Sequence, residues 1–246
     1  MRTRMMVLLA TLMVVAVPAA ALAQTDESTI RGIVTDERPA RDLSELRARA
    51  LAAIDRRLET IDRLQHRIEE SDNLTGEHHG QLNSELVRHE AGLEQLAREV
   101  EAAATVSELL AVAPKIVTDH RIYVLVVPKV VEVIASDTGV AFAARGGEVA
   151  ATLATWIERA AELGHDTSDA EEALSRMESH LEAGLALAGP VAESVLPLQP
   201  PDWPDPARVV LEDGRQALSD ARQEFRAARD AAHEIIEILR GLFGRD

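Results

Sequence analysis

Apolar side chains recur every three or four residues along most of this 246-residue chain. Because an α-helix has 3.6 residues per turn, this spacing places them on one helical face. The chain is therefore expected to form helices that bury these faces against one another. The first two runs are Leu51, Ile54, Leu58, Ile61, Leu64 and Ile68, followed by Leu82, Leu86, His89, Leu93, Leu96, Val100 and Ala103.

These two runs predict a pair of long helices, the first beginning near Asp42 and ending near Ser71. The short turn from Asp72 to Gly76 joins them. Two long helices joined by so few residues are expected to fold back as an antiparallel hairpin.

The longest run follows a connector, Leu196 to Pro206, that holds five prolines. Asp205 and Pro206 suit the cap and first position of a helix. The three-four alternation then continues for four heptads and predicts a left-handed coiled-coil seam, whose partner lies in this chain or in another copy. The seam positions are Leu211, Gly214, Leu218, Ala221, Phe225, Ala228, Ala232, Ile235, Leu239 and Leu242.

A third helix is predicted in the middle of the chain, where Thr105 and Glu108 match a capping box. Its later part, residues 116–134, is apolar on nearly every face and is expected in the centre of a bundle. Pro128 is expected to kink or divide it. A buried strand over Tyr123 to Val133 is the alternative, but no second comparable run is present to pair with it.

Two further helices are predicted over residues 149–163 and 168–188, after a glycine-containing loop from Asp137 to Gly147. The features that mark their ends are Gly164 and the capping pair Ser168 and Glu171, and Gly189-Pro190 is expected to weaken or end the second of these helices. Together these patterns predict an all-α fold: an elongated antiparallel bundle of about six helices with coiled-coil-like seams.

The N-terminus has the pattern of a secretory signal peptide over residues 1–23. Arg2 and Arg4 precede an apolar run of 13 residues, and Ala21-Leu22-Ala23 offers small residues for cleavage. This run is shorter than the roughly 20 residues that cross a bilayer, so no membrane anchor is expected after cleavage. Residues 24–41 are predicted to be a flexible arm and residues 42–246 a helical domain, secreted or located in the cell envelope.

Composition excludes several kinds of partner and site. The chain holds 26 basic and 42 acidic side chains, a formal net charge of −16, which disfavours nucleic acid and anionic lipid. The absence of cysteine excludes disulfides, thiolate metal sites and lipid attachment through cysteine. Aromatic residues make up 2% of the chain, too few for stacking platforms.

Histidine spacing suggests a metal site without establishing one. Three pairs have the single-turn spacing of helical metal ligands, but none has an evident second motif facing it. His89 falls on an apolar seam, where a hydrogen-bonded core histidine is expected, and His78-His79 is interpreted as an exposed helix start. No metal or other cofactor is predicted. The pairs are Asp62 and His66, Glu85 and His89, and Asp230 and His233.

No catalytic residue is predicted either. The chain has no cysteine nucleophile and no serine in a strand-turn-helix elbow. Gly146-Gly147 follows no strand, so it does not predict a phosphate-binding loop. Carboxylates are so frequent that a pair of them indicates little beyond a solvated helix face. The sequence therefore favours a protein that is not an enzyme.

One segment, residues 118–129, resembles a stretch of uncharacterised exported all-α bacterial proteins. The shared motif has an arginine and a tyrosine before an apolar run that ends in Pro-Lys; here these residues are Arg121, Tyr123, Pro128 and Lys129. The resemblance extends more loosely to the hairpin turn, to the turn at residues 164–167 and to the proline-rich connector. It implies an exported helical protein and no assigned activity.

The expected function is a non-enzymatic structural or interaction protein of the cell envelope or exterior, which binds a protein partner or itself through helical faces. The alternative is a ligand- or metal-binding bundle of the envelope-sensor type, using histidines of the second and third helices. The surroundings of Asp119, His120, Arg121 and Tyr123 distinguish a scaffold from a site. If these residues are buried and satisfy one another's hydrogen bonds, they belong to the scaffold. If they lie around an open pocket, they form a candidate site.

Overall fold

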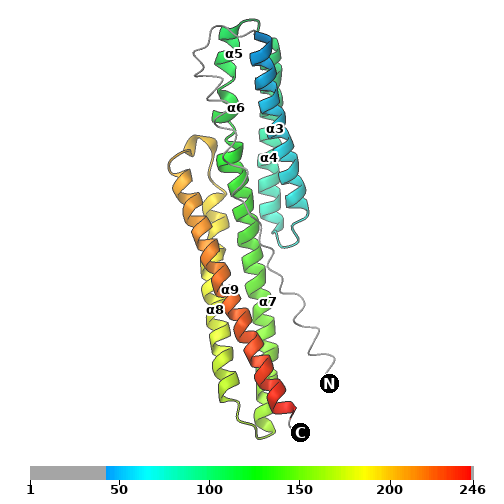
Figure 1. The fold of residues 1–246 in the computed structure, drawn as a ribbon, viewed down its shortest axis with the longest axis vertical. Coiled ribbons are helices and arrows are strands. Elements are labelled where there is room, and N and C mark those ends of the chain that lie inside the picture. Colours follow the sequence, from blue (N-terminus) through cyan, green and yellow to red (C-terminus); the bar gives the residue numbers. More distant parts are fainter. Residues whose placement is uncertain (1–42, 245–246) are drawn as a thin grey trace. The chain divides into compact units, whose positions relative to one another are not determined.

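The computed structural model describes residues 43–244, and the predicted signal peptide and arm lie outside this range. No β-strand occurs within residues 43–244, so the all-α fold class is confirmed (Figure 1). In the same range, no helix is both long and apolar enough to cross a membrane. The elements are α3 (Leu43–Glu69), α4 (Gly76–Ala102), α5 (Val106–Val112), α6 (Lys115–Thr118), the π-helix η1 (Ile122–Val126), α7 (Val127–Glu162), α8 (Ser168–Val195), the 3-10 helix η2 (Pro200–Asp202) and α9 (Ala207–Phe243).

Contacts divide the described residues into two compact units. Unit 1 contains residues 135–192 and 214–244, and unit 2 contains residues 43–134 and 193–213. Helices α7, α8 and α9 each contribute residues to both units.

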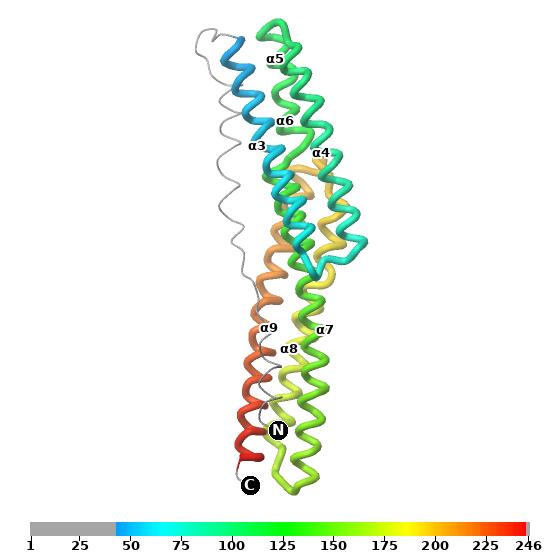
Figure 2. The backbone as a smooth tube through the Cα atoms, turned by 90° about the vertical axis from the view of Figure 1, so that its right-hand side faces the viewer, coloured from blue at the N-terminus to red at the C-terminus, as the bar shows by residue number. Residues whose placement is uncertain are grey.

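In unit 2, α3 and α4 form the predicted hairpin and lie side by side (Figures 1 and 2). The start of α3 meets the end of α4, where Arg47 Nε donates to the carbonyl oxygen of Val100 at 3.3 Å. The Thr75 hydroxyl caps α4 by accepting from the amide of His78 at 3.2 Å. The apolar residues at the centre of both predicted runs, such as Ile61 and Leu86, are buried.

The predicted third helix is interrupted and forms α5, α6 and η1. Its Thr105 cap is confirmed, because Thr105 Oγ1 accepts from the amide of Glu108 at 3.2 Å. The reciprocal bond of the predicted capping box differs, since the Glu108 carboxylate accepts from the amide of Ala104 at 2.7 Å instead of that of Thr105. Arg121 adopts a left-handed backbone with φ 46°, which ends α6 before η1 begins. In η1 the hydrogen bonds reach back five residues, from the amide of Val127 to Ile122. The chain becomes α-helical at Val127, so Pro128 lies in the first turn of α7, where its missing N–H is tolerated.

The predicted loop over residues 137–147 is wrong, because α7 runs through it without a break. A Cβ atom on Gly139 would lie 2.8 Å from the Cβ of Ala188, and one on Gly146 would lie 2.5 Å from Leu181 Cδ2. These glycines allow α8 to approach α7 closely instead of forming a turn. The predicted fourth helix is therefore part of α7. Within residues 43–244, five helices, rather than six, have 27 or more residues.

The core of unit 1 is built around Phe225 of α9. Its ring centroid lies 4.7 Å from that of Phe142 on α7. Gly184 on α8 makes room for the ring, since a Cβ atom there would lie 2.4 Å from Phe225 Cε1. The predicted seam of α9 is buried at every position except Leu242, which is half-buried. The apolar face of α9 is thus covered within the chain itself.

Gly189-Pro190 was expected to weaken or end its helix, and the end is wrong, because α8 continues through both residues to Val195. Ser136 of α7 supplies hydrogen bonds beside the proline. Its hydroxyl donates to the carbonyl oxygen of Ala188 at 2.7 Å and accepts from the amide of Ala192 at 3.3 Å. A neighbouring side chain thus supports the helix where proline lacks an N–H.

The turn between α7 and α8 confirms the predicted end of one helix and corrects the predicted cap of the next. Gly164 ends α7 with φ 87°, as predicted. The residues that cap the start of α8 lie one or two positions before Ser168, the expected cap. Asp166 Oδ1 accepts from the amide of Ser168 at 3.1 Å. Thr167, in place of Ser168, bonds to Glu171, with 2.6 Å between the hydroxyl and the carboxylate.

Gly139→Ala is expected to lower the free energy of unfolding by about 2 kcal/mol, because an added methyl group overpacks the contact with Ala188. Gly147→Ala, in the same helix, is the matched control, since nothing lies within 4 Å of a Cβ atom there. It should raise stability by roughly 0.5–1 kcal/mol. Urea unfolding of both variants measures the difference, and equal effects would contradict the role assigned to Gly139.

Candidate functional site

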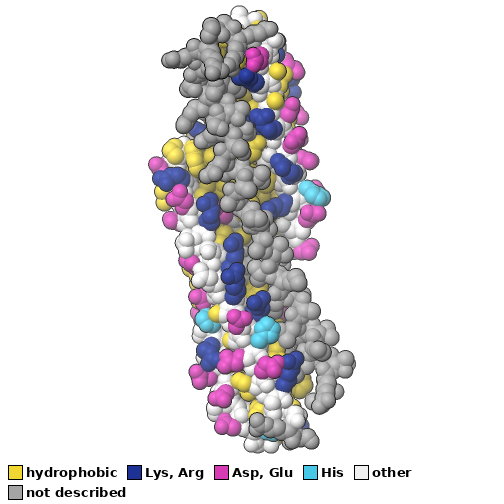
Figure 3. Space-filling view, in the orientation of Figure 1, with side chains coloured by type: hydrophobic (Ala, Val, Ile, Leu, Met, Phe, Trp, Pro, Cys, Tyr) yellow, Lys and Arg dark blue, Asp and Glu magenta, His cyan; other side chains and the backbone are white. Residues whose placement is uncertain are grey.

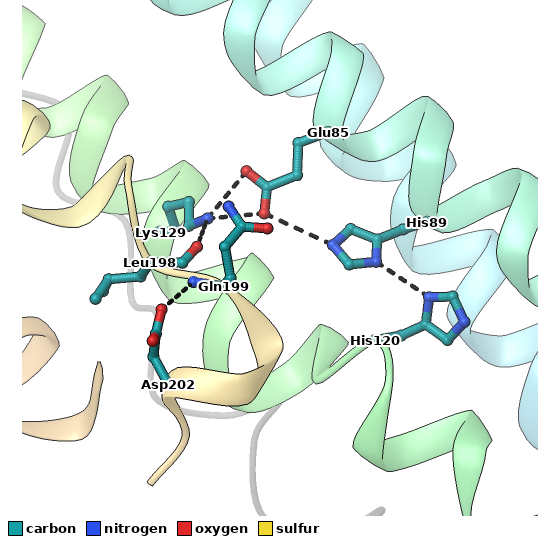
Figure 4. A network of polar contacts seen from close by, with 7 residues as sticks. All are labelled: Glu85, His89, His120, Lys129, Leu198, Gln199 and Asp202. Atoms are coloured by element: carbon teal, nitrogen blue, oxygen red, sulfur yellow. Dashed lines mark hydrogen bonds and ion pairs between the residues drawn. The ribbon is translucent and has the colours of Figure 1, made fainter. Parts of the chain in front are cut away.

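Unit 2 buries four ionisable side chains that contact one another in sequence, here termed the buried network (Figure 4). Glu85 and His89 lie one turn apart on the inner face of α4. Lys129 comes from the first turn of α7, and His120 from the segment between α6 and η1. The network therefore joins three separate parts of the chain.

Lys129 is fully buried, with 0% of its surface exposed. Its ammonium donates to both carboxylate oxygens of Glu85, at 2.7 and 3.0 Å, and to the carbonyl oxygen of Leu198. An ammonium has three hydrogens, so each has an acceptor. Such complete pairing is what allows a charge to be held away from water.

The contact with Leu198 fixes the proline-rich connector in place. Leu198 also buries its own side chain. The backbone N–H of the next residue, Gln199, donates to Asp202 Oδ2 at 2.7 Å at the start of the short helix η2 (Figure 4). The charge of Lys129 thus holds the connector to α7, and through Glu85 to α4.

The two histidines of the network contact each other directly. Their Nδ1 atoms are 3.1 Å apart, and the rings meet edge to face with centroids 5.3 Å apart. His89 Nε2 lies 3.6 Å from Glu85 Oε1. When this Nε2 carries hydrogen toward the carboxylate, His89 Nδ1 accepts the hydrogen bond that His120 Nδ1 donates.

Gly92 explains how His120 approaches α4 so closely. A Cβ atom on Gly92 would lie 2.5 Å from Cε1 of the His120 ring. Any larger residue at this position would displace the imidazole and break its contact with His89.

Burial and neighbouring charges shift two pKa values in the network. Burial, followed by the nearby His89, lowers the pKa of His120 to about 4, with Asp119 opposing and Arg57 adding to the effect. His120 is therefore neutral at pH 7. Burial by itself would raise the pKa of Glu85, but the contacts with His89 and Lys129 outweigh it and hold that pKa below its ordinary value. Glu85 is therefore the anion that pairs with Lys129.

The four residues chosen to distinguish a site from a scaffold do not share one location. His120 belongs to the buried network, whereas Asp119 is exposed and accepts from the Thr118 hydroxyl at 2.6 Å. The Tyr123 hydroxyl donates to the carbonyl oxygen of Arg56 at 3.3 Å. The buried Arg57 guanidinium lies 5.1 Å from the centroid of the Tyr123 ring. The buried Nε of Arg121 has no hydrogen-bond partner among residues 43–244. The four residues therefore do not form one site, and they meet the criterion for a scaffold only in part.

The other histidine pairs lie on helix surfaces. His66 is exposed and contacts Glu70 at 3.1 Å instead of Asp62. His233 and Asp230 are also exposed. Within the described part of the chain, no three histidine, aspartate or glutamate side chains converge as a metal site.

Sequence reasoning identified the Glu85 and His89 spacing but missed the partners that face them. Lys129 lies 44 residues after Glu85, and His120 lies 31 residues after His89. The available signal was the presence of ionisable residues on otherwise apolar faces of two helices. Periodicity shows that such residues need partners, but does not show which ones meet.

Searches for related proteins do not add a function to this geometry. No family model, curated protein or solved structure matches the chain. The chemistry of the buried network is therefore the basis for assigning it a role: an ion pair in which all three lysine N–H groups have acceptors, beside two histidines that contact each other.

Lys129→Met is expected to lower the free energy of unfolding by roughly 3–5 kcal/mol, because it leaves the Glu85 carboxylate buried without its cation. The double variant Lys129→Met/Glu85→Leu should recover part of this loss, since it removes both charges. Urea unfolding of Lys129→Met, of Glu85→Leu and of the double variant gives the coupling energy between the two side chains. Strictly additive losses would show that the two charges do not stabilise one another.

The histidine pair predicts a pH effect on stability in protein treated with chelator. The pKa of His120 is about 4 when folded, against 6.5 for an ordinary histidine, so the unfolded chain takes up its proton first as the pH falls. Relative to His120→Gln, the wild type should lose about 2 kcal/mol of stability between pH 6.5 and 4. Urea unfolding across this range measures the difference, and a constant difference would contradict the lowered pKa. Glu85, whose pKa is also lowered, should contribute its own loss only below pH 4.5.

Proposed function

We propose that this protein is an exported, non-enzymatic helical protein that serves as a structural spacer or interaction module of the cell envelope or exterior. The signal-peptide pattern of residues 1–23 supports export. The main support for a non-enzymatic, structural role is the hydrogen bonding of Lys129, whose three N–H groups all have acceptors in this chain. A charge committed in this way stabilises the fold and has no donor left for a substrate.

The outer faces of the long helices are then the surfaces that contact partners. The seam of α9 is covered within the chain, and its heptad spacing supports coiled-coil-like packing against the other helices of unit 1. Partners are therefore expected on the polar faces of the helices. Binding of this kind is compatible with either a different protein or a second copy.

Cross-linking in intact cells tests this function. Full-length protein with a C-terminal affinity tag should give discrete cross-linked products in the envelope or the medium. A control variant without residues 1–23 should remain inside the cell and lose those products. Exported protein that stays monomeric and yields no cross-linked partner would contradict the proposal.

A metal-binding bundle is the second candidate, favoured by the histidine pair. The two Nδ1 atoms are 3.1 Å apart, close to the roughly 3.3 Å between two nitrogen ligands of one tetrahedral zinc ion. Glu85 stands behind His89 at 3.6 Å, as a carboxylate that orients a ligating imidazole does. Water or an external ligand would complete the coordination.

Elemental analysis of protein purified without chelator or histidine tag tests this candidate. Metal at one equivalent, lost in both His89→Gln and His120→Gln, would support it. Protein with no stoichiometric metal after incubation with zinc would end it.

A further inference from the structure

Helix α9 carries a row of basic side chains along one face, here termed the arginine stripe: Arg215, Arg222, Arg226 and Arg229. Steps of seven, four and three residues keep them on one side of the helix over about 21 Å. Arg215, Arg222 and Arg226 are exposed and Arg229 is half-buried. Figure 3 shows Lys and Arg side chains in a row over α9.

Acidic side chains lie on other faces of α9, and two of them are paired with residues of α8. Glu224 contacts His180 of α8 at 2.7 Å, and Glu234 contacts Arg176 of α8 at 2.6 Å. Glu224 is two residues from both Arg222 and Arg226, which places it about 160° around the helix from them. Glu224 and Glu234 are thus paired with α8, whereas Arg222 and Arg226 form no ion pair with it.

The middle of the stripe lacks counter-charges. Neither Arg222 nor Arg226 has an ion pair with any residue between 43 and 244, whereas Arg208 in the same helix pairs with Glu212 at 3.3 Å. Like charges three and four residues apart repel each other on a helix. A partner that brings carboxylates to this face would relieve the repulsion and gain paired Arg–carboxylate hydrogen bonds.

The overall charge of −16 does not prevent such binding, because charges more than about 8 Å away are screened at physiological ionic strength. It does favour a narrow partner. A flat anionic surface would also approach the acidic residues beside the stripe, such as Asp230 and Glu237, which are exposed. A single helix, about 10 Å across, would approach fewer of these carboxylates, the nearest being Asp230 at 3.8 Å from Arg229 Nε.

We propose that the arginine stripe docks an acidic α-helix of a protein partner, with glutamate or aspartate repeated every three or four residues. Carboxylates at this spacing match the stripe along its length, because both helices rise by the same distance per residue. This inference rests on the proposed interaction function and names the surface and the class of partner.

Fluorescence anisotropy with the full mature chain tests the docking surface. The probe is a labelled, alanine-based helical peptide with glutamate at alternating four- and three-residue steps. A peptide of the same composition with glutamate on all faces is the pattern control. The patterned peptide should bind more tightly, and binding should weaken as salt is raised.

Arg222→Gln/Arg226→Gln should weaken binding of the patterned peptide by about tenfold. The control Arg88→Gln/Arg159→Gln, with the same charge change at exposed positions outside the stripe, should change it by less than about twofold. Both pairs lie on helix surfaces, and circular dichroism checks that both variants remain folded. Equal effects of the two pairs, or equal binding of the two peptides, would overturn the proposal.

Vesicles containing phosphatidylglycerol form a second arm of the test. Absence of stripe-dependent vesicle binding supports the helix as occupant, and vesicle binding that exceeds peptide binding and depends on Arg222 and Arg226 overturns it. The two proposals fail separately. Cellular cross-links without peptide binding would reject the stripe alone, whereas peptide binding without any cellular cross-link would reject the interaction function.

Discussion

The ammonium of Lys129 is the constraint on which unit 2 depends. A buried charge is tolerated only when every donor has an acceptor, and here the acceptors come from Glu85 of α4 and Leu198 of the connector. One side chain thereby fixes the positions of segments far apart in the sequence. Glu85 is held in turn beside His89, and His89 beside His120, whose ring fits against Gly92.

Unit 1 is held by a different interaction, the close approach of helices at small residues. Phe225 fills the space left by Gly139 and Gly184, and Ser136 bridges α7 and α8 beside Pro190. These contacts depend on shape more than on charge. In unit 1, ion pairs such as Arg176 with Glu234 lie on the exposed surface, where they contribute little to stability.

The sequence predicted the features that depend on local chemistry. Periodicity located α3, α4 and α9, the Thr105 cap was correct, and Gly164 ended α7 as expected. The errors came from glycine and proline, which break helices in some settings and are tolerated in others. Gly139 and Pro190 are helical because Ala188 and Ser136 lie opposite them, and these partners are known only once the helices are packed.

In the candidate site, too, the sequence predicted what local spacing determines and missed what packing determines. The spacing of Glu85 and His89 placed both on one face of α4, and His89 was expected to be a hydrogen-bonded core residue, which is confirmed. Their contacts with Lys129 and His120 come from the tertiary fold. Periodicity also identified residues 116–134 as a central segment without indicating that its lone lysine would be fully buried.

Differential labelling of lysine amines tests the buried ion pair most directly, because the chain has only two lysines, Lys115 and Lys129. The Lys115 side chain is 49% exposed and that of Lys129 is 0% exposed. Reductive methylation of the native protein, followed by peptide mass spectrometry, should modify Lys115 and leave Lys129 unmodified, and both should react in urea. Comparable labelling of the two lysines in the native protein would contradict the account.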